Sequence, residues 1–235
     1  MAQKQFALDE YTTVTIYKRR SSRNLRLSIA ADGSVRVSIP AWAPYSAGVQ
    51  FAKSRHEWIT AQRQPERYLA HGQRIGKAHH LQFVPTSSSK VTSRVRTSEV
   101  VVSHPNHVLS TSPAVQKTAS TAALRALRMQ AAELLPRRMA SLAELHGFEY
   151  RSVVVKRLKS RWGSCDQNGN IVLNLFLMQL PWDCIDYVLL HELTHTRLMR
   201  HGPDFWQAMK TVLPDVADRR KRLRAYHPVL DSAVS

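Results

Sequence analysis

The chain has 235 residues, 43% of them hydrophobic, which is enough for one large domain or two small ones. No apolar run approaches the ~20 residues that span a membrane, and the first ten residues lack the apolar segment of a signal peptide, so we expect no membrane partner. The 34 Lys and Arg outnumber the 17 Asp and Glu, and the net charge of +17 suits nucleic acid or phosphorylated substrates, or simply a basic solvated surface.

Cys165 and Cys184 are the only cysteines in the sequence. Two cysteines do not make a disulfide framework, so we expect both to be reduced in a cytoplasmic protein. Neither lies in the C-x-x-C spacing of a sulfur zinc site, so any metal should be held by nitrogen.

Residues 1–110 predict a β-rich region with one helix. An alternating strand is expected at 11–17, and segments 24–29 and 34–39 flank Asp32-Gly33 as a hairpin. A helix should start at Ser46 and reach about Gln62. Short strands are expected in 72–105, where we interpret His79 and His80 as surface residues.

Residues 111–235 predict a second domain, which begins where strands give way to helix. A long helical stretch starts near Thr111 and ends at Gly147, and Pro136 should kink or break it. Strands are expected at 150–158, 160–165 and 170–176. The run 183–195 contains no Pro or Gly and repeats Ile185, Leu189 and Leu193 every four residues, which predicts a helix.

This last helix carries the sequence HELTH at residues 191–195. Because four residues make little more than one turn, His191 and His195 share a face, ~6 Å apart, and two imidazoles can bind one tetrahedral ion. Glu192 is placed to hold a metal-bound water and take its proton. So short a motif also arises by chance, but the helix is apolar around most of its circumference, and buried His and Glu need partners.

His201 is the candidate third ligand. It lies beyond the ligand helix, where Gly202-Pro203 must turn the chain. If that turn folds back, His201 reaches the metal; otherwise Asp215 or Asp218 is the likeliest substitute. A basic cluster at 219–224 is usually a solvated face, with nucleic-acid contact as the alternative.

Several segments together resemble the bacterial YgjP-like metallopeptidase family, which is related to the SprT and WLM zinc peptidases. They are RWGSC at 161–165, the strand through Asn174, the helix 186–195 and HGPDFW at 201–206. The resemblance implies an α+β, zincin-like core: a helix, a small sheet, the HExxH helix and closing helices, preceded by the β-rich N-terminal region. It also implies His191, His195 and His201 as Zn²⁺ ligands and Glu192 as the catalytic acid/base. A metzincin shares the histidine spacing but needs Gly where this chain has Leu198.

The first function hypothesis is therefore a zinc metallopeptidase that cleaves peptide bonds with a zinc-bound water activated by Glu192. Substrate-binding candidates are Arg161, Trp162, Ser164 and Tyr187, although we slightly favour a tight structural crossing beside the site as the role of 161–165.

The second hypothesis is a metal-dependent nucleoside triphosphate (UTP) pyrophosphatase, an activity also attributed to this family. Lys156, Arg157, Lys159 and Arg161 would neutralise the phosphates, but no glycine-rich phosphate loop is present. The third is a non-catalytic zinc-containing or DNA-binding module, which would leave Glu192 without a task.

Overall fold

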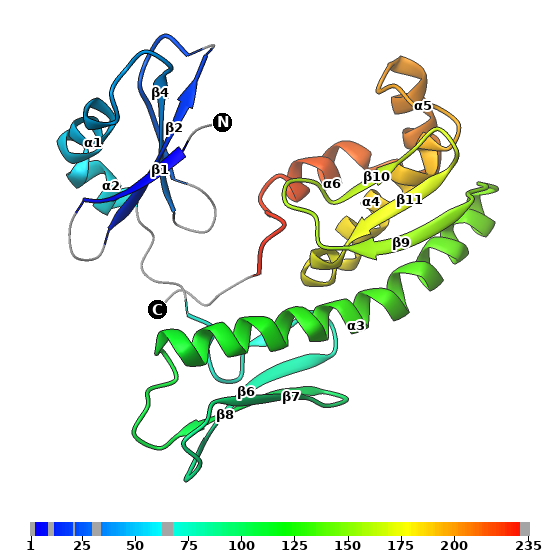
Figure 1. Cartoon of the computed structure of the whole chain (residues 1–235). Coiled ribbons are helices and arrows are strands. Elements are labelled where there is room, and N and C mark those ends of the chain that lie inside the picture. The colour runs from blue at the N-terminus through cyan, green and yellow to red at the C-terminus, as the bar shows by residue number, and fades with distance from the viewer. Residues whose placement is uncertain (1–2, 9–11, 21, 30–33, 63–67, 231–235) are drawn as a thin grey trace. The chain divides into compact units, whose positions relative to one another are not determined.

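The computed structural model describes residues 3–8, 12–20, 22–29, 34–62 and 68–230. The chain divides into two compact units, Met1–Arg67 with Val234–Ser235, and Tyr68–Ala233. Each unit is described by itself (Figure 1). Among the described residues, no helix is both long and apolar enough to cross a membrane.

The first unit is a four-stranded sheet with two helices. Its elements are β1 (Gln3–Ala7), β2 (Thr13–Arg19), β3 (Arg26–Ile29), β4 (Val35–Pro40), α1 (Tyr45–Ser54) and α2 (His56–Gln62). The strand order is β1-β2-β4-β3, and β3 pairs antiparallel with β4, as the expected hairpin requires. The Asp32-Gly33 turn lies outside the described residues. Alternate residues of β2 and β4, such as Ile16 and Val37, form a core with Ala52 and Ile59 of the helices.

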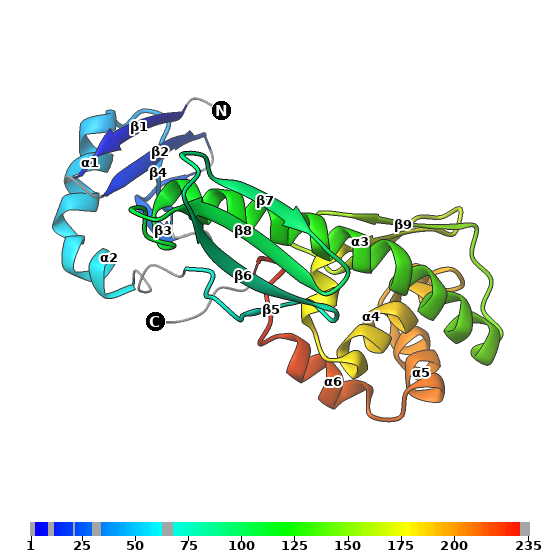
Figure 2. The ribbon, with the colours of Figure 1, turned by 90° about the horizontal axis from the view of Figure 1, so that it is seen from below.

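The second unit begins with another four-stranded sheet and a long helix. Its elements are β5 (Arg74–Ile75), β6 (His79–Thr86), β7 (Thr92–Val95), β8 (Glu99–Pro105) and α3 (Pro113–His146). The strand order is β5-β6-β8-β7, with β6 and β8 parallel. Figure 2 shows α3 running along this sheet and on past its end.

Pro136 does not break α3, which is one helix of 34 residues. Proline removes one backbone hydrogen bond, whereas Leu135 and Met139 on either side of it are fully buried in the core. Burial of this face holds the helix together across the proline. Gly147 ends α3 in the left-handed conformation, as its position predicts.

Because α3 packs on both sheets of this unit, β5–β8 belong to the same compact body as the histidine helix. The compact units therefore divide between Arg67 and Tyr68, whereas the change from strands to helix lies near residue 110. His79 at the start of β6 was predicted as a surface residue, and this prediction is wrong. Its side chain is buried between β6 and α3, where its Nδ1 lies 2.7 Å from Nε2 of Gln130.

The rest of the second unit builds the site. Its elements are β9 (Ser152–Lys156), β10 (Gly163–Cys165), β11 (Asn170–Asn174), the 3-10 helix η1 (Leu175–Gln179), α4 (Trp182–His195), α5 (Pro203–Val212) and α6 (Val216–Leu223). The small sheet has the order β10-β11-β9, so β10 is an edge strand. The protein thus has an α+β fold, with the expected order of helix, small sheet, histidine helix and closing helices behind a β-rich N-terminal region.

Candidate metal centre

The helix α4 positions two histidines and one glutamate. Its residues Ile185, Leu189 and Leu193 are completely buried, as their four-residue spacing predicts. Glu192 and His195 are 5% and 8% exposed, and His191 is half-buried. Polar groups at this depth need partners, and the next segment of the chain supplies one.

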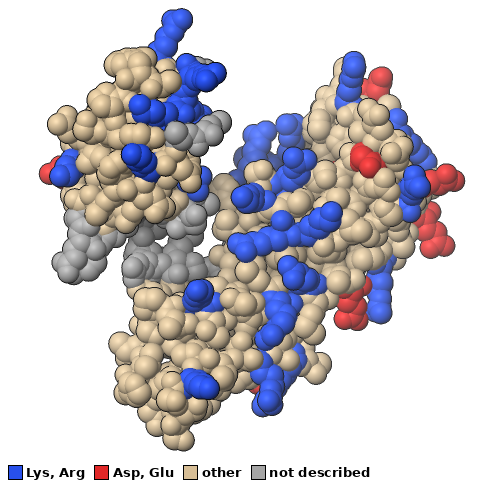
Figure 3. All heavy atoms as spheres, viewed as in Figure 1, with Lys and Arg blue, Asp and Glu red and all other residues tan. Residues whose placement is uncertain are grey.

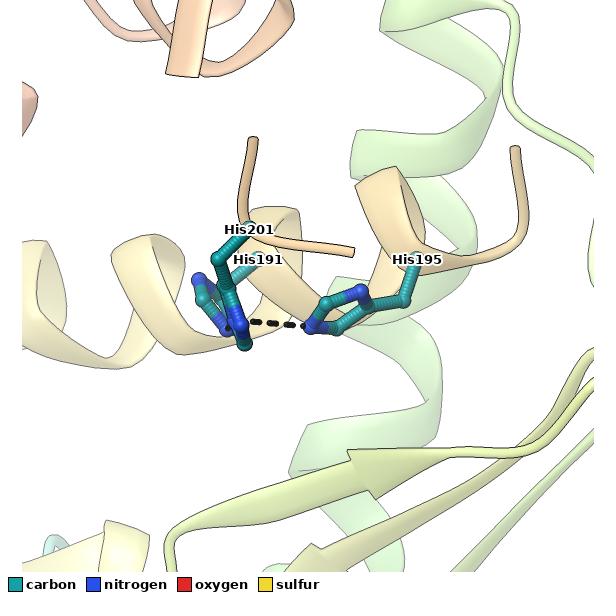
Figure 4. Close-up of side chains that lie close together, drawn as sticks. All are labelled: His191, His195 and His201. Atoms are coloured by element: carbon teal, nitrogen blue, oxygen red, sulfur yellow. Dashed lines mark hydrogen bonds between the residues drawn. The ribbon is translucent and has the colours of Figure 1, made fainter. Parts of the chain in front are cut away.

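The segment between α4 and α5 returns His201 to the helix. Nε2 of His201 lies 3.0 Å from Nε2 of His191 and 3.1 Å from Nε2 of His195 (Figure 4). These three histidines are the only group of metal-ligating side chains that clusters closely in the described part of the chain, with ligand atoms within 4.8 Å of one another. Asp215 instead pairs with Arg219 at 2.8 Å, so it does not join the histidines.

A hydrogen bond determines which ring nitrogen of His195 is free to bind a metal. Its Nδ1 lies 3.0 Å from the Leu198 carbonyl, which can only accept, so in the neutral ring Nδ1 carries the hydrogen and Nε2 presents a lone pair. Nε2 of His201 has at most one hydrogen and cannot donate to both of its neighbours. One cation accepting three lone pairs would satisfy all three Nε2 atoms, and tetrahedral bonds of 2.0–2.1 Å would separate these nitrogens by roughly 3.4 Å. The donor set therefore fits a metal ion.

Burial favours the neutral, metal-binding form of the His191 and His195 rings. It lowers the pKa of His191 to about 3, helped by the charges of His195, His201 and Arg220. Burial also lowers the pKa of His195, although the hydrogen bond to the Leu198 carbonyl acts in the opposite direction. Neutral imidazoles are ligand-competent without losing a proton first.

Aromatic rings close the cluster on its α5 side. The Phe205 ring lies 4.7 Å from that of His195 and 4.9 Å from that of His191. The Trp206 ring stacks on His201, at 5.9 Å and an interplanar angle of 26°. These contacts hold the three imidazoles in place.

Glu192 faces the edge strand β10. A Cβ on Gly163 would lie only 2.6 Å from Oε1 of Glu192, so the backbone of β10 rests directly against the carboxylate. Burial raises the pKa of Glu192 to about 8, and the charge of the nearby Arg161 opposes that rise. Gly163 was not predicted as a site residue, although a glycine inside a strand can signal such a close approach.

The four substrate-binding candidates lie at different places around the centre. The Tyr187 ring is 5.9 Å from His191, one turn earlier on α4. Trp162 is half-buried just before Gly163, and Arg161 is exposed but close enough for its charge to act on Glu192. Ser164 alternates with Gly163 along β10, so its side chain lies on the face of the strand opposite Glu192.

Asn174 holds the approach to β10 in place. Its completely buried amide donates to the carbonyls of Arg161, at 2.8 Å, and Leu158, at 3.0 Å. Its backbone N–H donates to the Trp162 carbonyl at 2.8 Å. The role of Asn174 is therefore to fix the loop that delivers Trp162 and Gly163 to the centre.

Three clustered imidazoles beside a buried carboxylate, on an α+β fold, are the arrangement expected of a metallopeptidase. Comparison with protein families leads to the same class. The model of the YgjP-like metallopeptidase domain matches residues 23–226, and the chain belongs to this family.

No curated protein matches the chain. Among solved structures, the crystal structure of the metallopeptidase zymogen of Pyrococcus abyssi abylysin is similar at 20% identity, over 39% of this chain and 93% of that one, with a TM-score of 0.36.

Proposed function

We propose that the protein is a zinc peptidase in which His191, His195 and His201 hold the metal and Glu192 transfers protons. The observation that carries this proposal is the convergence of three Nε2 atoms beside one buried carboxylate. All four residues fall within 111–235, the segment that we assign as the catalytic domain. Three nitrogen donors and no thiolate favour Zn²⁺ and leave a fourth coordination position open.

The chemistry divides between the metal and the chain. A bound Zn²⁺ ion would supply Lewis acidity, which lowers the pKa of a water to about 7 and polarises a carbonyl. The positive charge of a bound Zn²⁺ would counter the effect of burial on the pKa of Glu192 and favour its ionised form. The carboxylate can then take a proton from the attacking water and deliver it to the amide nitrogen that leaves. The backbone of Gly163 packs against the Glu192 carboxylate and restricts its position. Phe205 and Trp206 pack against the imidazoles and restrict theirs.

The edge of β10 is suited to an extended peptide. Trp162 and Asp166 exchange backbone hydrogen bonds with β11, so by alternation Gly163 and Cys165 direct their N–H and C=O groups to the outer edge. We infer that substrate adds there as a further strand, which places its backbone beside Glu192. Trp162 and Tyr187 then flank the peptide, whereas the backbone groups of Ser164 face β11.

Metal content and hydrolysis, measured on a matched pair of variants, test this proposal. We expect purified protein to hold one zinc per chain by elemental analysis. Glu192→Gln should keep the zinc and lose hydrolysis by at least about a thousandfold, because it removes the proton carrier but no ligand. His201→Ala should lose both, because two imidazoles hold zinc much more weakly than three.

The assay should offer casein, a peptide library and UTP in parallel. Peptide cleavage that disappears with a chelator and returns with Zn²⁺ is the expected result. Preferential hydrolysis of UTP would overturn the peptidase and favour the pyrophosphatase with its basic segment 156–161. A His201→Ala variant with full zinc would overturn the assigned ligand set. Wild-type turnover in Glu192→Gln would overturn the assignment of Glu192 as the proton carrier.

A further inference from the structure

An open hollow of about 230 Å³ lies beside the metal centre. Its lining residues come from the start of β10 and from α6 with the turn that follows it: Trp162, Arg220, Leu223, Arg224 and Tyr226. We call this hollow the arginine pocket. The apolar lining and two guanidinium groups distinguish it from an ordinary basic surface.

The Trp206 ring connects the arginine pocket to the histidines. The guanidinium of Arg220 lies 4.5 Å above the Trp206 ring, and Trp206 in turn stacks on His201. On the other wall, Trp162 directly precedes Gly163, against which Glu192 rests. A substrate group in the pocket would therefore lie close to the bond being cut.

The arginines of α6 and its following turn differ in their partners. Arg219 pairs with Asp215 and Arg222 pairs with Asp183, so those two contribute to folding. No carboxylate of the described residues forms an ion pair with Arg220 or Arg224. The basic cluster at 219–224 thus separates into a structural part and a part that faces the pocket.

We propose that the arginine pocket binds a carboxylate of the substrate peptide next to the scissile bond. The inference rests on the proposed peptidase function. Guanidinium groups bind carboxylates through paired hydrogen bonds, and the rings of Trp162 and Tyr226 with Leu223 suit the methylenes that carry such a group. The carboxylate belongs to an Asp or Glu side chain or to the C-terminus of the peptide.

Cleavage-site sequencing tests this specificity. Zinc-loaded wild type is incubated with a random peptide library in two forms, with a free or an amidated C-terminus. For a side-chain carboxylate, Asp and Glu should be enriched at one position beside the cut in both forms; for a terminal carboxylate, only free peptides should be cut, near their end.

Two charge-reversal variants provide the matched comparison. Arg224→Glu should lower kcat/KM for the acidic substrate by about tenfold or more and shift the preference to Lys or Arg at the same position. Lys221→Glu makes the same charge change on α6 but does not line the pocket, so its preference should match the wild type. Arg220→Gln should also weaken the acidic preference.

A binding measurement separates failure of this inference from failure of the proposed function. Immobilised Glu192→Gln protein should retain acidic library peptides over matched amide peptides, and Arg224→Glu in that background should not. If the wild type cleaves no peptide but the Glu192→Gln protein still retains acidic peptides, the peptidase proposal fails and the arginine pocket stands. Equal retention of acidic and amide peptides, or an equal effect of Lys221→Glu, would overturn the arginine pocket.

Discussion

Gly163 lies so close to Glu192 that no side chain fits between them. We expect Gly163→Ala to reduce kcat by about a hundredfold, because a Cβ 2.6 Å from Oε1 must displace the carboxylate and small displacements in a catalytic geometry are costly. The zinc content should stay at the wild-type level, since no ligand is touched. Steady-state kinetics and elemental analysis on the same preparation check this, and wild-type kcat would show that Glu192 tolerates the shift.

The local part of the centre could be predicted from the sequence, and the non-local part could not. Helix periodicity brings His191 and His195 to one face whatever surrounds them, so their spacing alone predicts the pair. Gly163 meets Glu192 only because β10 packs on α4, a contact that no local pattern encodes. His79 was wrongly expected at the surface for the same reason, because its partner Gln130 is far away in the sequence.

At the scale of elements, α3 is joined to the β5–β6 turn by one buried amide. Oε1 of Gln130 accepts from the backbone N–H groups of Lys77, at 2.6 Å, and Ala78, at 3.2 Å. Its Nε2 donates to the Ile75 carbonyl at 2.8 Å and contacts His79. All of its hydrogen-bonding capacity is therefore used inside the protein.

Gln130→Leu should consequently lower the free energy of unfolding by about 3 kcal/mol or more, because it leaves several buried polar groups without partners. Denaturant unfolding followed by circular dichroism measures the effect. Met129→Leu, at an exposed position on the same helix, is the control and should change stability by less than about 0.5 kcal/mol. A similar decrease in both variants would mean that the amide network contributes little.

The order of elements in the second unit could be predicted because each has its own periodicity and end signals. Two features of this unit could not be predicted from the sequence, and both involve α3. Pro136 suggested an interruption, but burial of Leu135 and Met139 outweighs the missing hydrogen bond. The compact unit that begins at Tyr68 includes β5–β8 because α3 packs on two sheets, a contact that strand and helix patterns do not specify. The boundary of the catalytic domain near residue 110 stays a prediction.

At the scale of the whole molecule, the positive charge is broadly spread. Figure 3 shows Lys and Arg over much of one face of the larger unit, with the few Asp and Glu near one edge. In the smaller unit, the strands β1–β4 carry five Lys and Arg and no Asp or Glu. The buried faces of β2 and β4 meet α1 and α2, so Tyr17 and Arg19 lie on the face opposite these helices.

The last prediction is therefore salt-dependent, sequence-independent binding of nucleic acid, with the strands of the smaller unit as its main contact. Arg219 and Arg222 of the basic cluster at 219–224 are already paired with carboxylates, which lowers what that cluster can offer to phosphates. Arg19 and Arg26 are both exposed and lie on the sheet face that carries Tyr17.

Binding of duplex DNA should weaken as salt rises, and the Arg19→Gln, Arg26→Gln double variant should reduce the slope of log K against log salt by about 2, at roughly 0.9 for each phosphate that the variant no longer neutralises. Electrophoretic retardation over a salt series measures the slope. Absence of retardation at low ionic strength would leave the charge of +17 as a solvated surface. An unchanged slope in the double variant would move the nucleic-acid interface away from this sheet.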